Sequence, residues 1–313
     1  MNARTVLRRI LTLVAALLLS VSANAQLFRA YLASDGNDAN PCNLSAPCRL
    51  LPAALSAVAD GGEIWMLDSA NYNTATVTIG KSVSILAVPG AVGSVVAIGG
   101  PAISITAGSL TVALRNLVIV PLVGGGGTDG VYMTGASALT IEDSLIANLP
   151  SRGVYVSGTG TVKIANTTLR NNGDYAVWAQ NGANVSISGT KMLRNQTGGV
   201  VAYGFTATTT TAVVSDSIIS GGANGVVAAT AIAGATAQVF VTRSTIENAN
   251  FALYSETAGV GSALVSVSNS MITKNDYAWY QEGTGSVIES SGNNHIRGNA
   301  NTPLSPLTNV GLQ

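Results

Sequence analysis

Most of the chain repeats a short unit in which apolar and polar positions alternate. The segment 174–195, DYAVWAQNGANVSISGTKMLRN, shows the unit: apolar runs at 176–179, 185–187 and 191–193 are separated by Gly- or Asn-containing stretches. Alternation with a period of two is typical of strands with one buried face, and Gly/Asn clusters are typical of turns. The unit therefore predicts three short strands joined by tight turns.

Variants of this unit recur with a nearly constant period. An apolar anchor ends the middle strand of each unit, and a second apolar residue follows five positions later. The anchors are Leu114, Ile141, Ile164, Ile187, Val214, Val241 and Val267, and the second residues are Ile119, Ile146, Leu169, Met192, Ile219, Ile246 and Ile272. Successive anchors lie between 23 residues (Ile141 to Ile164) and 27 residues (Leu114 to Ile141) apart. Such a period indicates a solenoid.

A turn residue stands two positions after each anchor. These residues are Asn116, Asp143, Asn166, Gly189, Asp216, Arg243 and Asn269. All except Arg243 are of types that accept left-handed backbone geometry in tight turns. Leucine-rich repeats have a similar period, but they are Leu-dominated and often contain helices. Val, Ile, Ser and Thr dominate here without helical periodicity, so the sequence predicts a parallel β-helix.

The N-terminal part differs from the repeats. Leu27–Ala33 is predicted as a strand, and Arg49–Ala59 as a helix that Gly61-Gly62 terminates. Glu63–Leu67 is predicted to return to strand. We expect the helix to cover the N-terminal end of the stack, because an uncovered coil would expose unpaired backbone groups.

A family resemblance appears in the same region. Residues 34–72, SDGNDANPCNLSAPCRLLPAALSAVADGGEIWMLDSANY, lead into TIGKSVSIL. This run resembles the start of right-handed parallel β-helix proteins of the pectate-lyase-like class, where a Gly-x-Asp turn, a short helix and a Gly-Gly-x-Ile strand precede the first coils. It most resembles a largely uncharacterised group of exported bacterial β-helix proteins. The resemblance implies an all-β, right-handed parallel β-helix with an N-terminal capping helix, and a connection with polysaccharides.

The first 25 residues have the pattern of a secretory signal peptide. Arg4, Arg8 and Arg9 precede an apolar run, Ile10–Leu19, and Ala23-Asn24-Ala25 places small residues before a cleavage site after Ala25. A membrane anchor is the alternative, but the run is shorter than the roughly 20 residues of a spanning helix. We therefore expect a secreted, periplasmic or cell-surface protein with no membrane span after cleavage.

The remaining chain divides into 26–100, the N-terminal cap and first coils; 101–300, the repeats; and 301–313, a tail. Removing three of the 15 basic residues leaves 12 against 15 acidic residues, a net charge near −3. No Lys/Arg cluster indicates a nucleic-acid partner.

The two cysteines, Cys42 and Cys48, are close in sequence. In an exported protein they predict a disulfide. A metal site is the alternative, but two ligands without a nearby His or further Cys rarely hold zinc. Asp35 and Asp38 could bind calcium, yet the loop lacks the ligand order and the distal Glu of an EF-hand. The calcium-binding acidic cluster of pectate lyases has no counterpart either, so we expect no cofactor.

The first strand of each unit predicts a column of aromatic side chains. Its inward positions are Val131, Val154, Val177, Val200, Val226, Leu253 and Trp279, and its outward positions are Tyr132, Tyr155, Trp178, Val201, Val227, Tyr254 and Tyr280. Five of the seven outward residues are aromatic, although aromatics make up only 5% of the chain. Such rings could stack on sugars, so the predicted carbohydrate-binding residues are Tyr132, Tyr155, Trp178, Tyr254 and Tyr280. Alternatively, the rings stack on one another and shield the sheet, or a register shift buries them.

Two residues further along, the outward positions are Thr134, Ser157, Gln180, Tyr203, Ala229, Glu256 and Glu282. Glu256 and Glu282 would lie on adjacent coils about 5 Å apart, near the separation of the carboxylates in a retaining glycosidase. They are the candidate catalytic residues, although exposed acidic residues are ordinarily only solvated.

The sequence favours a non-catalytic carbohydrate-binding or cell-surface interaction module, with an extended polysaccharide or cell-surface component as its partner. A polysaccharide lyase or glycoside hydrolase acting on acidic polysaccharide is the first alternative. A structural or adhesive protein is the second.

Overall fold

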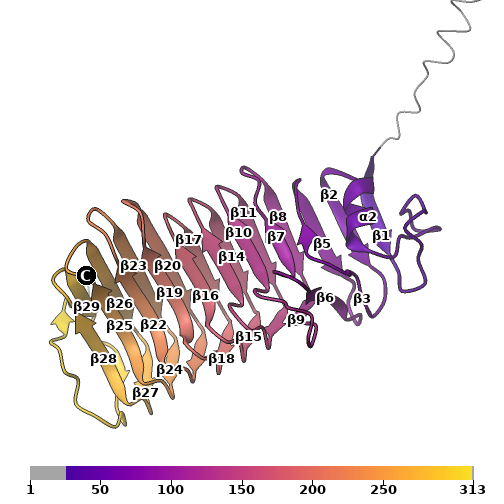
Figure 1. The fold of residues 1–313 in the computed structure, drawn as a ribbon. Helices are drawn as coiled ribbons and strands as arrows, with labels where there is room; N and C mark the ends of the chain where they lie inside the picture. The colour runs from indigo at the N-terminus through magenta and orange to yellow at the C-terminus, as the bar shows by residue number, and fades with distance from the viewer. Residues whose placement is uncertain (1–25, 312–313) are drawn as a thin grey trace, which may run out of the picture.

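The structure is a computed structural model that describes residues 26–311. The predicted signal peptide, residues 1–25, lies outside the described residues. Figure 1 shows an elongated stack of coils, with helix α2 (Leu51–Ala57) at one end and strand β28 at the other.

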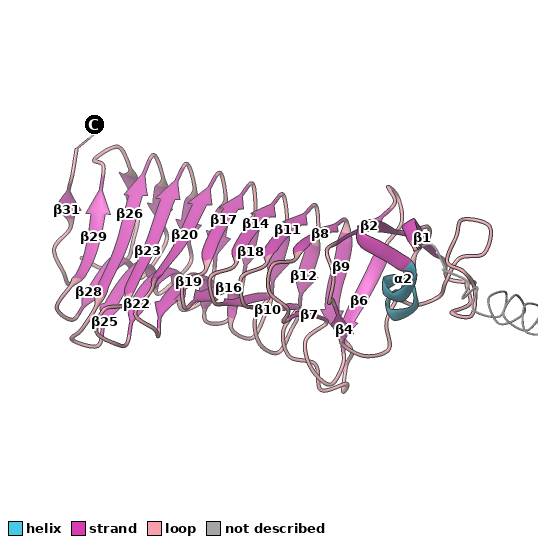
Figure 2. Ribbon diagram, turned by 90° about the horizontal axis from the view of Figure 1, so that it is seen from above, coloured by secondary structure: helices cyan, strands magenta, loops and turns pink. Residues whose placement is uncertain are grey.

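The coils build three parallel sheets of 12, 9 and 10 strands, and each coil from β7 to β27 contributes one strand to each sheet. Sheet 1 contains, in spatial order, β1 (Leu27–Leu32), β2 (Val58–Met66), β5 (Val83–Ala87), β8 (Thr111–Arg115), β11 (Ala138–Glu142), β14 (Thr161–Ala165), β17 (Asn184–Ser188), β20 (Thr209–Ser215), β23 (Thr236–Thr242), β26 (Ser262–Ser268), β29 (Ser286–Ser290) and β31 (Thr308–Asn309). Figure 2 shows these strands side by side along the stack. The architecture is therefore a parallel β-solenoid.

Sheet 2 and sheet 3 have the same arrangement. Sheet 2 contains β4 (Val77–Thr78), β7 (Ile103–Ile105), β10 (Val131–Thr134), β13 (Val154–Ser157), β16 (Tyr175–Gln180), β19 (Gly198–Gly204), β22 (Asn224–Thr230), β25 (Phe251–Thr257) and β28 (Tyr277–Glu282). Sheet 3 contains β3 (Ala70–Asn71), β6 (Gly93–Ala97), β9 (Leu117–Pro121), β12 (Leu145–Ala147), β15 (Thr168–Arg170), β18 (Lys191–Leu193), β21 (Ile218–Ser220), β24 (Thr245–Glu247), β27 (Met271–Thr273) and β30 (His295–Ile296).

The core runs along the inside of the three sheets. Every predicted anchor and every second apolar residue is buried in it. In the coil that begins at β16, for example, Val177, Ile187 and Met192 bring one core side chain from each sheet. The apolar periodicity therefore predicted the interior correctly.

The turn from sheet 1 to sheet 3 has left-handed geometry in every repeat. All seven predicted turn residues have φ between 45° and 57°, and Arg243 has φ 45° like its neighbours. A second left-handed row, which the sequence analysis did not identify, follows sheet 3. Its members are Asn148, Asn171, Arg194, Gly221, Asn248, Lys274 and Gly298.

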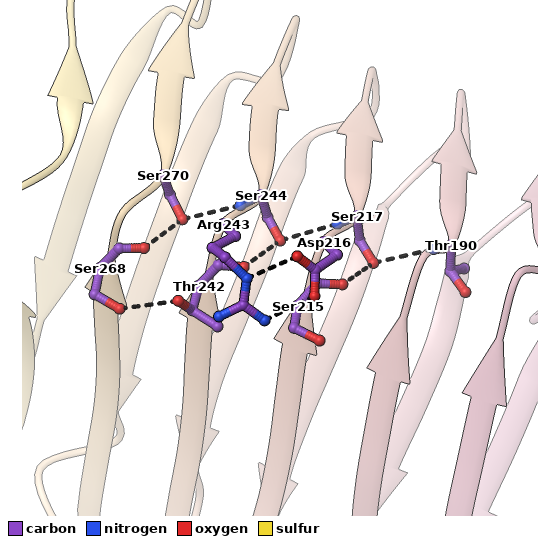
Figure 3. A network of polar contacts seen from close by, with 9 residues as sticks. All are labelled: Thr190, Ser215, Asp216, Ser217, Thr242, Arg243, Ser244, Ser268 and Ser270. Atoms are coloured by element: carbon purple, nitrogen blue, oxygen red, sulfur yellow. Dashed lines mark hydrogen bonds and ion pairs between the residues drawn. The ribbon is translucent and has the colours of Figure 1, made fainter.

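Buried hydroxyl groups connect successive coils at the first of these turns. The ladder consists of Ser144, Thr167, Thr190, Ser217, Ser244 and Ser270, each three residues after an anchor. Figure 3 shows its C-terminal part. Ser217 is representative, because its Oγ donates to the Ser215 carbonyl (2.7 Å) and accepts the N–H of Thr190 in the preceding coil (3.1 Å). The side chains thus satisfy backbone groups that the turn removes from the sheets.

The N-terminal cap differs from the prediction in its boundaries. Helix α2 is shorter than the predicted Arg49–Ala59 and ends because Val58 adopts extended geometry (φ −76°, ψ 144°). Gly61 and Gly62 do not terminate it; they lie inside β2, where the register against β1 shifts. Gly62 is required there, since a Cβ would meet the Phe28 carbonyl oxygen at 2.5 Å. The helix buries Leu51, Ala54 and Leu55 against the first coil, as expected for a cap.

The predicted disulfide is present. Cys42 and Cys48 are bonded, their Cα atoms lie 4.6 Å apart, and both side chains are buried in the core cluster.

The C-terminal end is covered by the tail. Trp279 belongs to the inward column and packs partly buried against the core, and its indole N–H donates to the Ser305 carbonyl (2.9 Å). Strand β31 pairs with β29. A cavity of about 280 Å³ lies between the last coil and this tail, lined by Trp279, Ile296, Arg297 and Pro303 among others.

Candidate functional site

The predicted columns of sheet 2 are in register. Each outward residue pairs with its predicted neighbour, from Tyr132 with Tyr155 to Tyr254 with Tyr280. The inward residues of β10 to β25 are buried. No register shift therefore buries the aromatic column.

Sheet 2 carries most of the aromatic residues of the chain. Ten of the 16 aromatic residues (3 Trp, 9 Tyr and 4 Phe) lie in its strands, and nine of the ten are on its outer side. Its strands contain no Lys or Arg, and their only charged residues are Glu256 and Glu282. The outer face of sheet 2 is thus chemically distinct from those of sheets 1 and 3, where Lys163 and Lys191 occur.

The N-terminal part of this face is a stacked pair with an arginine over it. The rings of Tyr132 and Tyr155 stack with centroids 5.1 Å apart. The Arg152 guanidinium lies 4.0 Å from the Tyr155 centroid, at a distance typical of a cation–π contact. Its Nε is also 2.8 Å from the Asp129 carboxylate, which is buried. Arg152 is therefore already paired.

The middle of the face is a small second core outside the solenoid. Val201 and Val227 point outward yet are only 2% and 3% exposed, because Tyr175, Trp178, Tyr203 and Tyr254 pack with them. The Tyr175 ring lies over Gly198. A Cβ added at Gly198 would meet Cε1 of Tyr175 at 2.7 Å.

The hydroxyl of Tyr175 reaches two strands along the stack, where it accepts a hydrogen bond from the Asn224 amide (3.3 Å). Burial raises the pKa of this hydroxyl to about 12, and the carboxylates of Asp174 and Glu256 act in the same direction.

The C-terminal part contains four stacked rings. Phe251 contacts Tyr254, Tyr277 and Tyr280 with centroids 5.3–5.8 Å apart, and Tyr254 stacks on Tyr280 at 5.7 Å. The four rings come from two adjacent strands, β25 and β28.

The two candidate catalytic residues lie beside these rings. Glu256 pairs with Glu282 in the register of β25 and β28. The hydroxyl of Tyr254 donates to Glu282 Oε2 at 2.9 Å. Burial raises the pKa of Tyr254 above its usual value, and hydrogen bonding to Glu282 and the charge of Glu256 raise it further. Tyr254 is therefore a protonated donor near two carboxylates.

Comparisons with known proteins agree with the fold. The family described as "Right handed beta helix region" matches residues 114–238. The solved structure of pectate lyase Pel9A is similar with a TM-score of 0.68 at 15% identity, covering 92% of this chain and 82% of that one. The structure of XylC with xylose gives 0.61 at 8% identity, covering 86% and 70%. The chain is a right-handed parallel β-helix repeat protein.

A third structure shows that this fold also forms part of larger molecules. Tailspike protein 2 from the Escherichia coli O157:H7 bacteriophage CAB120 gives a TM-score of 0.52 at 10% identity, and the β-helix protein spans only 38% of its length. No curated protein sequence matches this chain. At these identities the solved structures show the fold alone.

The predicted site residues of the β-helix protein lie on one face but form separate groups. Tyr132 and Tyr155 form one group, Trp178 belongs to the second, and Tyr254 and Tyr280 belong to the third. The rings stack on one another, as the sequence-based alternative proposed. Part of each ring face is therefore covered, and the side chains are half-buried.

Sequence reasoning missed a second row of residues, which lie at the first position of the sheet 2 strands or in the turns before them. It consists of Asp129, Arg152, Tyr175, Gly198, Asn224, Phe251 and Tyr277, each three residues before its partner in the aromatic column. Aligning the coils at this position would have revealed it, since three of the seven residues are aromatic. These residues complete the packing around the column.

Metal sites are not apparent in the described part of the chain. Among residues 26–311, no three His, Cys, Asp or Glu side chains group in a way that could hold a metal ion. Asp38 accepts the N–H groups of Arg49 and Leu50, both at 2.8 Å, so it supports the start of the helical segment. No helix within residues 26–311 has the length and hydropathy to cross a membrane.

Proposed function

We propose that this β-helix protein binds an extended carbohydrate along the outer face of sheet 2 without cleaving it. The observation that carries this proposal is the gathering of aromatic side chains on that face. Carbohydrate-related β-helix proteins are frequent among its structural neighbours, which include a pectate lyase and a protein solved with xylose.

The packing of the rings supports binding. Tyr132, Tyr155, Trp178, Tyr254 and Tyr280 are all half-buried, so each ring has an accessible portion. Their mutual contacts fix their rotamers, which lowers the entropy that a ligand must remove when it binds.

Polar groups lie next to the rings and could exchange their present hydrogen bonds for bonds to sugar hydroxyls. The Trp178 indole N–H donates to Gln180 Oε1 (2.9 Å), and the Gln180 amide donates to the Tyr155 hydroxyl (2.7 Å). Glu256 and Glu282 offer further acceptors at the C-terminal part.

The direct test is an array of defined glycans probed with the chain from residue 26 onward, followed by calorimetry and product analysis. Binding of one glycan class with no change in its length after prolonged incubation would support the proposal. Absence of binding to any glycan, or conversion of the bound glycan to shorter products, would contradict it.

Glycosidic cleavage is a second candidate, favoured by the Glu256–Glu282 pair. Neighbouring strands lie about 4.8 Å apart, close to the separation of a retaining pair of roughly 5–5.5 Å. The Tyr254 hydroxyl, which donates to Glu282 Oε2 at 2.9 Å, would hold one carboxylate of the pair in place. If a glycan is cleaved, replacing both residues by Gln should abolish turnover; an unchanged rate would exclude them as catalysts.

A further inference from the structure

The charged side chains in the strands of the proposed binding face are all negative. The nine strands of sheet 2 hold two carboxylates, Glu256 and Glu282, and no basic residue. Arg152, in the turn before β13, is the basic residue that contacts the rings, and it is engaged by the buried Asp129. Lys274, in the turn before β28, pairs with Glu247 of sheet 3 at 3.5 Å.

Both carboxylates lie at the C-terminal group of rings. Glu256 and Glu282 are paired in the register of β25 and β28. The Tyr254 hydroxyl donates to Glu282 Oε2, so the tyrosine lies beside this pair. Phe251, Tyr254 and Tyr280 form the stacked surface beside them. Asp174 and Asp276 directly precede Tyr175 and Tyr277, and they add negative charge at the edge of the face.

We infer that the glycan recognised by sheet 2 carries free amino groups, as in a polymer of unacetylated hexosamine. This inference rests on the proposed function and names the class of its ligand. An ammonium group would be attracted by two carboxylates and by the negative faces of the neighbouring rings. A uronic acid would place its carboxylate against Glu256 and Glu282 with no basic side chain from sheet 2 to compensate.

Adjacent coils repeat the same chemistry at about 4.8 Å along the stack, so Glu256 and Glu282 form a short row in the direction of the proposed ligand. Aromatic rings flank that row. This combination favours an amino sugar over a basic peptide, because the sugar ring can stack on the aromatic side chains while its amino group meets the carboxylates.

The test compares four hexamers by calorimetry on the chain from residue 26 onward: glucosamine, N-acetylglucosamine, galacturonic acid and lysine. We expect the glucosamine hexamer to bind at least roughly tenfold more tightly than its acetylated form, and the galacturonic acid hexamer to bind most weakly. The double variant Glu256→Gln, Glu282→Gln should lose this preference and retain the weaker binding of the acetylated hexamer. The control Glu289→Gln removes a carboxylate from sheet 1 and should change nothing.

The outcomes separate the two proposals. Equal binding of the glucosamine and acetylated hexamers, or tighter binding of galacturonic acid, would overturn the inference while leaving glycan binding intact. Equal binding of the lysine hexamer would overturn it too, since charge alone would then suffice. Should none of the three sugars bind and a wider glycan array also fail, the proposed function itself would fall.

Discussion

The hydroxyl ladder makes a quantitative prediction at Ser217. Its Oγ accepts the N–H of Thr190, a residue with no exposed surface, at 3.1 Å. Ser217→Ala would leave that N–H unsatisfied, at a cost of about 1–3 kcal/mol. The Ser215 carbonyl, to which Ser217 donates, keeps its bond from the Gly189 N–H at 3.2 Å. The expected loss is therefore about 2 kcal/mol of the free energy of unfolding.

Thermal and urea unfolding followed by circular dichroism would measure this loss. For a chain of this size, about 2 kcal/mol corresponds to a fall of roughly 3–4 °C in melting temperature. Ser217→Thr is the matched control, since Thr167 and Thr190 fill equivalent positions, and it should stay within about 1 kcal/mol of the parent. Equal stability of Ser217→Ala and the parent would refute the assigned role of the ladder.

Three further predictions test other parts of the structure. Gly198→Ala should lower the free energy of unfolding by about 1–3 kcal/mol, because its Cβ would meet the Asn224 carbonyl oxygen at 2.5 Å and the Tyr175 ring at 2.7 Å. Gly108→Ala, with nothing within 4 Å, should be nearly neutral in the same urea titration. Replacing Cys42 and Cys48 by Ser should cost about 2 kcal/mol in the chain-entropy estimate for so short a loop; an unchanged urea midpoint would contradict it. Tyr175 has a folded pKa of about 12 against 10.0 ordinarily, so its contribution is fully present below pH 10 and is lost as pH rises toward 12. Tyr175→Phe should therefore reduce the loss of stability between pH 8 and pH 11.5 by about 2 kcal/mol, which urea midpoints at these two pH values would show.

The repeat pattern predicted the sheets and their register because both depend on properties that are local to each coil. Alternation fixes which side chains face inward, and a turn residue two positions after each anchor fixes where the strand ends. Arg243 follows the left-handed geometry of its neighbours although its residue type does not favour it. The stacked coils on either side impose the turn.

The site was less predictable because it depends on side-chain packing between coils. The column positions of Tyr254 and Tyr280 follow from register, but their stacking on Phe251 depends on rotamers that the strand pattern does not specify. The helix boundary was wrong for a related reason: Gly61 and Gly62 are needed for a close approach of β2 to β1, and this contact is invisible to a local rule on helix termination.

The central claim is that the outer face of sheet 2 binds the glycan. Its most direct test is the dissociation constant of the best-bound glycan for a variant in which Tyr155, Trp178, Tyr254 and Tyr280 are replaced by Leu, which keeps apolar cover over Val201 and Val227. Phe240→Leu, which removes a partly exposed ring from sheet 1, is the matched control. The account predicts a loss of at least roughly tenfold in affinity for the sheet 2 variant and no change for the control. Undiminished affinity in a folded sheet 2 variant would contradict it.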